Sequence, residues 1–149
     1  MGKKTIAAVG ILAALWLLTG CAVNRATASL TPGADLSNVK SFYVVTQPSD
    51  KNAVDKLIQD RLIKMGYSAK VGPEKTGSYG TDAIVTYLDK WMWDITMYMI
   101  DLTITLRNPE NNFPLATGKS MHTSLTRKSP EEMVDEVLTN IFQASNKAK

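Results

Sequence analysis

Residues 83–107, AIVTYLDKWMWDITMYMIDLTITLR, decide the fold of this chain. The stretch holds two long runs rich in β-branched and aromatic residues, 83–93 and 96–107, separated by a short connection at Asp94-Ile95. Two such runs joined by a tight connection predict an antiparallel β-hairpin. Alternate positions of the second run are apolar, so one of its faces is expected to be core. These positions are Tyr98, Ile100, Leu102, Ile104 and Leu106.

Three shorter segments on either side of the hairpin also read as strands. Residues 41–47 are β-branched and aromatic and are followed by Pro48, which marks a turn. Residues 67–71 resemble a short second strand before a glycine-rich loop. Residues 115–125 follow the turn at 108–112 and form a further predicted strand, with Ser120, His122 and Ser124 on alternate positions.

Two segments have the apolar spacing of amphipathic helices. The first ends near Gly66, where a C-terminal cap is expected, and its apolar face is Val54, Leu57, Ile58, Leu62 and Met65. The second begins with a capping box, Ser129 with Glu132, and Pro130 occupies its first helical position. Its apolar stripe is Met133, Val134, Val137, Leu138, Ile141 and Phe142. The polar tail after Phe142 is expected to fray.

The order strand, helix, strand, long hairpin, strand, helix predicts an α+β fold. An antiparallel sheet with both helices on one face buries every apolar stripe, which is a two-layer arrangement. We therefore expect a mainly antiparallel sheet of about four to five strands, covered on one face by two helices.

The N-terminal segment is hydrophobic and is followed by the only cysteine of the chain. Lys3 and Lys4 precede an apolar run over 6–18, and Leu18-Thr19-Gly20-Cys21 follows. A bilayer core requires roughly 20 apolar residues as a helix, so a secretory leader over residues 1–20 is favoured over a transmembrane anchor, which is the alternative.

The four residues 18–21 resemble the bacterial lipobox. This resemblance implies that the Cys21 thiol accepts a diacylglycerol, that the leader is removed, and that the new amino group is acylated, with palmitate among the acyl chains. Ala22 follows Cys21 where an aspartate would favour inner-membrane retention, which implies sorting to the outer membrane. Cys21 would then hold the mature chain at the periplasmic face of that membrane by its lipid.

Composition separates the mature chain into two parts and excludes one class of partner. Residues 21–38 lack helical or strand periodicity and are interpreted as a lipidated flexible tether; an ordered arm packed on the domain is the alternative. A single periplasmic domain is expected over 39–149. Without Lys3 and Lys4, 15 of the 17 basic residues remain against 14 acidic ones. Basic and acidic residues are interspersed, so no basic stripe indicates nucleic acid.

Catalysis receives little support from the sequence. The single histidine, His122, cannot supply a histidine metal cluster, and a surface or half-buried role is expected for it. Asp89, Asp94 and Asp101 could supply an acid and base pair, although exposed hairpin acids are the commoner interpretation. We therefore predict a chain that is not an enzyme and holds no cofactor.

The hairpin connection is the preferred interaction site. Trp91, Trp93, Met97 and Met99 cluster there, and such side chains dominate binding hot spots. The alternative is that these side chains close the core under the helices.

Two further site hypotheses remain. Arg127 and Lys128 precede the last helix, where cations and free backbone amides can bind phosphate; an ordinary helix cap is the alternative. Thioethers and imidazole suit Cu(I), although methionine more often serves in packing. The residues concerned are Met92, Met97, Met99, Met121 and His122.

Residues 36–142 resemble a group of small proteobacterial lipoproteins of unknown function. The resemblance rests on SFYVV at 41–45, WMWD at 91–94, LATGKS at 115–120 and RKSPE at 127–131. The layout is also similar to the helix-packed sheet of lipopolysaccharide-assembly and curli-secretion-type lipoproteins, which dock to larger membrane machines. This second likeness is one of fold, and fold does not fix function.

Together these features predict an outer-membrane lipoprotein that acts as a non-enzymatic binding or assembly subunit of an envelope complex. Its partners would be the membrane, through the lipid, and an envelope protein, but not nucleic acid. One alternative is a lipid or small-ligand carrier, which would need a pocket between sheet and helices. The other alternative is a Cu(I) binder.

Overall fold

The predicted hairpin forms the centre of the computed structural model, which describes residues 24–148. The predicted leader and Cys21 lie outside the described residues. No helix among residues 24–148 combines the length and apolarity that crossing a bilayer requires. In chain order the elements are β1 (Asn24–Leu30), β2 (Ser41–Val45), α2 (Val54–Lys64), β3 (Ser68–Gly72), β4 (Ala83–Asp94), β5 (Thr96–Arg107), β6 (Pro114–His122), the 3-10 turn η1 (Ser124–Thr126) and α3 (Pro130–Lys147).

The fold is α+β, as predicted, but the sheet is larger and more mixed than expected. It has six strands in the order β1-β6-β5-β4-β2-β3. Strand β2 runs parallel to both of its neighbours, β3 and β4, and the other pairs are antiparallel. Helix α2 connects β2 to β3. A helical crossover of this kind allows two consecutive strands to pair parallel, whereas a tight turn joins antiparallel strands.

Strand β1 corrects the expectation of a flexible tether over residues 21–38. Residues 24–30 pair antiparallel with β6, from Asn24 opposite His122 to Leu30 opposite Ala116. Most side chains of β1 are exposed because it is an edge strand, and this explains why its sequence shows no alternation. The folded part therefore includes residues 24–30, which precede the predicted boundary at residue 39.

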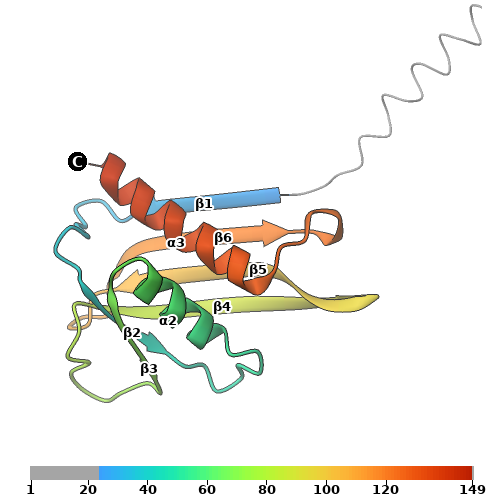
Figure 1. The fold of residues 1–149 in the computed structure, drawn as a ribbon. Coiled ribbons are helices and arrows are strands. Elements are labelled where there is room, and N and C mark those ends of the chain that lie inside the picture. The colour runs from blue at the N-terminus through green and yellow to red at the C-terminus, as the bar shows by residue number, and fades with distance from the viewer. Residues whose placement is uncertain (1–23, 149) are drawn as a thin grey trace, which may run out of the picture.

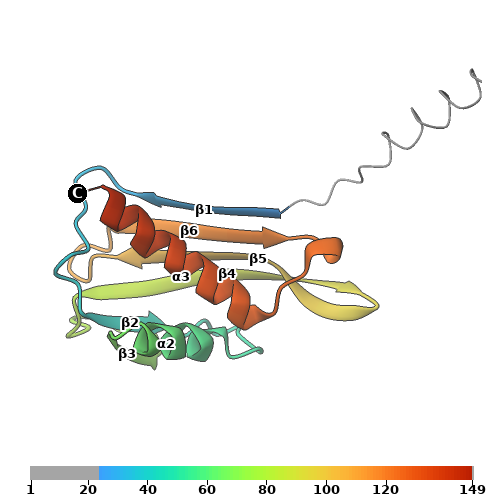
Figure 2. The same ribbon diagram turned by 45° about the horizontal axis from the view of Figure 1, so that its top comes forward.

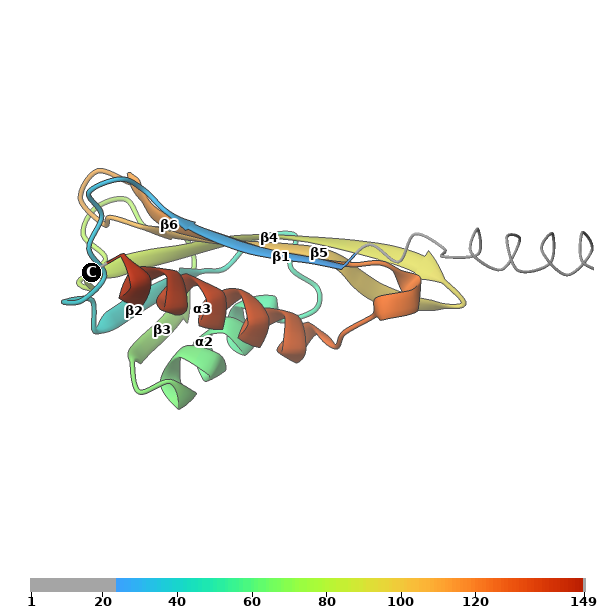
Figure 3. The same ribbon diagram turned by 90° about the horizontal axis from the view of Figure 1, so that it is seen from above.

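Both helices cover the same face of the sheet, as predicted (Figure 3). Between the two layers lies a core in which large side chains such as Phe42, Ile58 and Leu138 are completely buried. The predicted capping box is present: the Ser129 hydroxyl accepts from the Glu132 amide, and the Glu132 carboxylate accepts from the Ser129 amide. Helix α3 continues to Lys147, so the prediction of fraying after Phe142 was wrong.

A β-bulge changes the predicted core face of β5. Leu102, Ile104 and Leu106 are fully buried, as expected. The ladder then pairs Lys90 with Asp101 but Trp91 with Met99, so Ile100 is the extra residue. Met99 consequently takes the fully buried position, and Ile100 is only partly buried.

The hairpin of β4 and β5 extends beyond the rest of the sheet (Figures 1 and 2). Strand β6 ends at His122, and its last pair with β5 is Met121 opposite Asp101, so residues 96–100 of β5 have no partner on β6. Asn24, at the start of β1, is paired with His122. The described chain therefore begins at the same end of the sheet as the projecting hairpin.

Candidate functional site

Exposed apolar side chains gather at the projecting end of the hairpin. Four come from the hairpin itself and one from the neighbouring turn η1; they are Met92, Trp93, Ile95, Met97 and Leu125, here called the hairpin-end patch. Trp93 is 70% exposed, Ile95 87% and Leu125 80%. Met92 lies on the opposite face of the hairpin from Trp93 and Met97, so the patch surrounds the hairpin end. Exposed apolar side chains gathered at one end of a small domain indicate a contact surface.

Arg127 holds this end of the molecule together. Its guanidinium donates to the Asp94 carbonyl and to the Asp94 carboxylate, each at 3.0 Å, and to the Thr96 hydroxyl at 3.0 Å. It also lies over the Tyr98 ring, 4.1 Å from the ring centre. These contacts fix the segment between η1 and α3 against the hairpin, so the patch has a defined shape.

The backbone at the hairpin connection is strained. Ile95 has φ 61°, in the left-handed region. Glycine and asparagine occupy that region readily in hairpin turns, whereas a β-branched residue there is an outlier that costs about 1–3 kcal/mol. The turn therefore carries a large exposed apolar side chain at a position where folding alone favours a small or polar residue.

The structure separates the four residues predicted as the interaction site. Trp93 and Met97 are exposed in the patch, whereas Met99 is fully buried. Trp91 packs against the core, and its indole Nε1 donates to the Asp89 carboxylate at 2.6 Å. Trp91 and Met99 thus follow the alternative of a core role, and Ile95 and Leu125 are patch residues that the sequence did not indicate.

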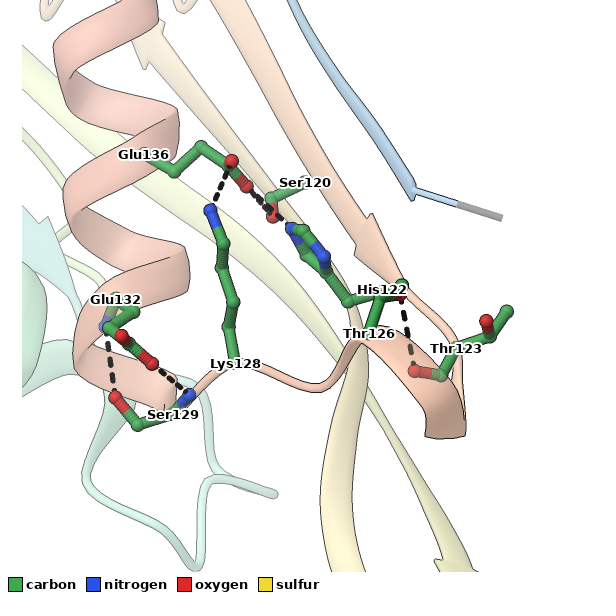
Figure 4. A network of polar contacts seen from close by, with 8 residues as sticks. All are labelled: Ser120, His122, Thr123, Thr126, Lys128, Ser129, Glu132 and Glu136. Carbon is green, nitrogen blue, oxygen red and sulfur yellow. Dashed lines mark hydrogen bonds and ion pairs between the residues drawn. The ribbon is translucent and has the colours of Figure 1, made fainter. Parts of the chain in front are cut away.

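A second polar cluster joins β6 to α3 (Figure 4). The Glu136 carboxylate accepts from the Ser120 hydroxyl at 2.5 Å and from Lys128 Nζ at 2.5 Å, and it lies 2.8 Å from His122 Nε2. His122 is fully buried, which corrects the expectation of a surface or half-buried histidine. The reason is that His122 alternates onto the face of β6 that meets α3, where Glu136 is opposite.

The electrostatics of this cluster favour an ionised Glu136. Burial by itself raises the pKa of Glu136, but hydrogen bonds from Lys128, Ser120 and His122 outweigh it and lower the pKa to about 2. Ser120 donates to the carboxylate, whereas a nucleophilic serine would donate to the histidine. We therefore assign the cluster a structural role, in which an ionised carboxylate holds β6 and α3 together.

The predicted anion site is not formed as free cations at a helix N-terminus. Arg127 is bound to Asp94, and Lys128 is bound to Glu136. The amides of Ser129 and Glu132 are also engaged, by the capping box. This arrangement matches the alternative of an ordinary cap.

The three hairpin aspartates do not form a catalytic pair. Asp89 accepts from Trp91, Asp94 binds Arg127, and the Asp101 carboxylate lies 2.9 Å from Lys119 Nζ. Each carboxylate is thus committed to a different structural contact.

The proposed Cu(I) ligands are dispersed. Met92 is opposite Tyr98, whose hydroxyl donates to the Met92 sulfur at 3.4 Å, and Met97 is opposite Trp93. These two pairs are successive in the ladder, and successive positions of a strand point to opposite faces of the sheet. The side chains of Met92 and Met97 therefore point away from each other. Among residues 24–148, no three His, Cys, Asp or Glu side chains form a group that could hold a metal ion.

The carrier hypothesis requires a pocket between the sheet and the helices, and the structure has its groove on the opposite face of the sheet. The interface between sheet and helices is filled by fully buried side chains. A groove of about 740 Å³ lies on the helix-free face, where Thr86, Thr103, Thr105 and Arg107 line it. Val45, Ile84 and Leu88 also line this groove, so its lining is mixed and does not single out an acyl chain as the ligand.

Comparison with solved structures finds two PelC structures of the same fold and one weaker match. A PelC dodecamer from Paraburkholderia phytofirmans, in a variant with one leucine replaced by methionine, matches with a TM-score of 0.58 and 14% identity, over 78% of this chain and 98% of that chain. A second crystal form of the PelC dodecamer from the same organism matches with a TM-score of 0.56, at the same identity and coverage. A minor lipoprotein from Acinetobacter baumannii gives a TM-score of 0.35 at 11% identity, over 74% of this chain and 93% of that chain.

The likeness to PelC shows the fold alone, because a sequence identity of 14% is too low to show a shared function. No protein-family model matches the chain, and no curated protein matches it in sequence.

Proposed function

We propose that this chain is a non-enzymatic binding or assembly subunit of the cell envelope. Lipid on Cys21 anchors it to the periplasmic face of the outer membrane, and its hairpin-end patch is the contact surface. The observation that carries this proposal is the patch itself, with Trp93 and Ile95 largely exposed on a hairpin that Arg127 fixes in place.

The anchor is supported by the sequence around Cys21. The only cysteine closes a short apolar leader in a lipobox-like context, where its thiol is the group that lipidation requires. One acyl chain binds a bilayer only marginally, whereas two or more hold a protein stably. Cys21 is three residues before Asn24, where the described sheet begins, so the anchor and the patch belong to the same end of the molecule.

A non-catalytic role is supported by the way the polar side chains are used. His122 and Ser120 both contact Glu136, and the hairpin aspartates pair with Trp91, Arg127 and Lys119. These contacts stabilise the fold and leave apolar area, not reactive groups, at the hairpin end.

The comparison with solved structures adds one candidate for the partner. The solved PelC structures of this fold are dodecamers. A second copy of this chain therefore belongs among the partners that the test has to recognise, beside a different envelope protein.

The test is site-specific photocrosslinking in membranes of the native host. A photoreactive amino acid replaces Trp93 in one variant and Phe113 in the other; Phe113 is also exposed but lies in the turn between β5 and β6, at the opposite end of the sheet. We expect a defined envelope protein, or this chain itself, to crosslink at position 93 and not at position 113.

Point variants supply the matched control. The double variant Trp93→Ala with Met97→Ala should lose the partner in a pull-down from membranes, while Phe113→Ala should retain it. Circular dichroism and thermal melts establish that all variants remain folded. Full recovery of the partner by the folded double variant would reject the patch as the contact surface.

A further inference from the structure

We propose that the hairpin end docks into the lipid surface to which Cys21 anchors the chain, so that the bilayer itself covers the hairpin-end patch. This inference rests on the lipid anchor of the proposed function, and it makes the bilayer, in place of a protein, the occupant of the same surface. The acyl chains would supply retention at the membrane, and the hairpin end would fix the orientation of the sheet.

The length of chain between anchor and sheet carries the first step. Asn24 is three residues after Cys21, and three residues span at most about 11 Å when fully extended. Asn24 is held in the sheet opposite His122. The start of β1 therefore cannot lie far from the plane in which the anchored cysteine meets the lipid.

The overhang of the hairpin carries the second step. Residues 96–100 extend β5 past its last partner on β6, and five residues of an extended strand cover about 17 Å. Asn24 lies only one residue beyond Arg25, which shares the level of Met121 and Asp101. With the strands directed at the membrane, the hairpin end thus reaches the plane of Cys21 even when the linker is fully stretched.

The chemistry of the hairpin end suits a lipid interface. Tryptophan is enriched where headgroups meet acyl chains, and Ile95 and Leu125 offer aliphatic side chains beside Trp93. The one carboxylate at the connection, Asp94, is bound to Arg127, so no unpaired negative charge has to enter the interface. Exposed Arg25 lies beside Asn24 at this end, where lipid phosphates would attract it.

The strain at Ile95 points in the same direction. Its left-handed backbone has a cost, and its side chain is 87% exposed, so contacts within the chain do not offset that cost. Burial of the isoleucine in an acyl environment would offset it. Among residues 24–148, the large apolar side chain with the greatest exposure therefore lies at the point that would enter the membrane first.

The experiment measures the depth of single positions in the native lipidated chain. Cys21 is the only cysteine, and lipidation consumes its thiol, so Ile95→Cys provides the sole free thiol for an environment-sensitive fluorophore. The control is Phe113→Cys at the opposite end of the sheet. Each labelled protein is reconstituted into vesicles of phosphatidylethanolamine and phosphatidylglycerol, with or without bromine on the acyl chains.

The expected result is that brominated chains quench the Ile95→Cys label about twofold or more and leave the Phe113→Cys label unchanged. Equal quenching at the two positions would overturn the proposal. A blue-shifted Ile95→Cys label that bromine does not quench would also overturn it, because a second copy of the chain would then cover the patch.

A second variant separates insertion from folding. Ile95→Asn introduces a residue that tolerates the left-handed backbone, so this variant should fold at least as well as the native chain. With Trp91→Phe in both proteins, Trp93 is the remaining tryptophan of the mature chain, and quenching of its emission by brominated chains should fall at least about twofold on Ile95→Asn. Unchanged quenching would contradict the role given to Ile95.

The two proposals fail in different ways. Mass spectrometry before reconstitution shows whether Cys21 carries lipid; if it does not, the anchor of the proposed function fails. If the lipidated chain shows no quenching at position 95 but still needs Trp93 and Met97 to recover a protein from membranes, only the lipid docking fails.

Discussion

The guanidinium of Arg127 lies over the ring of Tyr98, 4.1 Å from its centre, and so connects the segment before α3 to the projecting hairpin. The two residues are separated by β6 and η1 in the sequence. Residues 96–100 of the hairpin have no partner on β6, and this contact gives them a second point of support. A binding surface needs such support if it is to keep one shape.

Replacing Arg127 should loosen the hairpin end without unfolding the domain. Arg127→Ala removes the stacking on Tyr98 and the bonds to Asp94, which are partly exposed and together worth about 1 kcal/mol. Hydrogen exchange of the amides at 92–97 should accelerate, while exchange in the core strands stays unchanged. Unaltered exchange at the hairpin end would show that Arg127 does not support it.

The Glu136 cluster should make stability depend on acidity. The folded chain lowers the pKa of Glu136 from its usual 4.5 to about 2, so the contribution is present above pH 4.5 and is lost as the pH falls to about 2. Glu136→Gln should therefore cost roughly 2–3 kcal/mol of unfolding free energy at pH 7 and much less near pH 2. Urea unfolding of both proteins at several pH values measures the difference, and a cost independent of pH would contradict the assignment.

Gly118 should tolerate no side chain, because α3 packs directly on it. A Cβ at this position would lie 2.8 Å from Ile141 Cγ1 and 2.8 Å from Val137 Cγ1. Gly118→Ala should destabilise the fold by about 1–3 kcal/mol through overpacking. Ser29→Ala, on the exposed neighbouring strand β1, is the control and should change stability by no more than about 0.5 kcal/mol. Equal melting temperatures for the two variants would show that α3 can move away from β6.

Relief of strain at Ile95 should stabilise the isolated protein. Ile95→Asn places a residue suited to φ 61° in the turn and should raise the unfolding free energy by about 1 kcal/mol. Denaturant unfolding of the detergent-solubilised protein tests this. A loss of stability would mean that the Ile95 side chain contributes contacts within the fold.

Periodic segments of the sequence predicted the framework of the fold. The hairpin, both helices and the capping box of Ser129 and Glu132 were found where the apolar spacing and the cap residues indicated. These features depend on local chemistry, which the sequence contains directly.

The features that the sequence did not predict depend on contacts between distant segments. Strand β1 has exposed side chains and shows no alternation, so only its pairing with β6 reveals it. The bulge at Ile100 exchanged the burial of Ile100 and Met99. At the candidate site, the sequence indicated Trp93 and Met97, but it did not connect Leu125 and Arg127 to the hairpin because they follow β6 in the chain.

Mass spectrometry of the native product tests the central claim, a domain anchored by lipid at the end that carries the hairpin. The account predicts that residues 1–20 are absent and that Cys21 is the N-terminus, with a diacylglycerol on its thiol and an acyl chain on its amino group. A product that retains the leader and a free Cys21 thiol would contradict it.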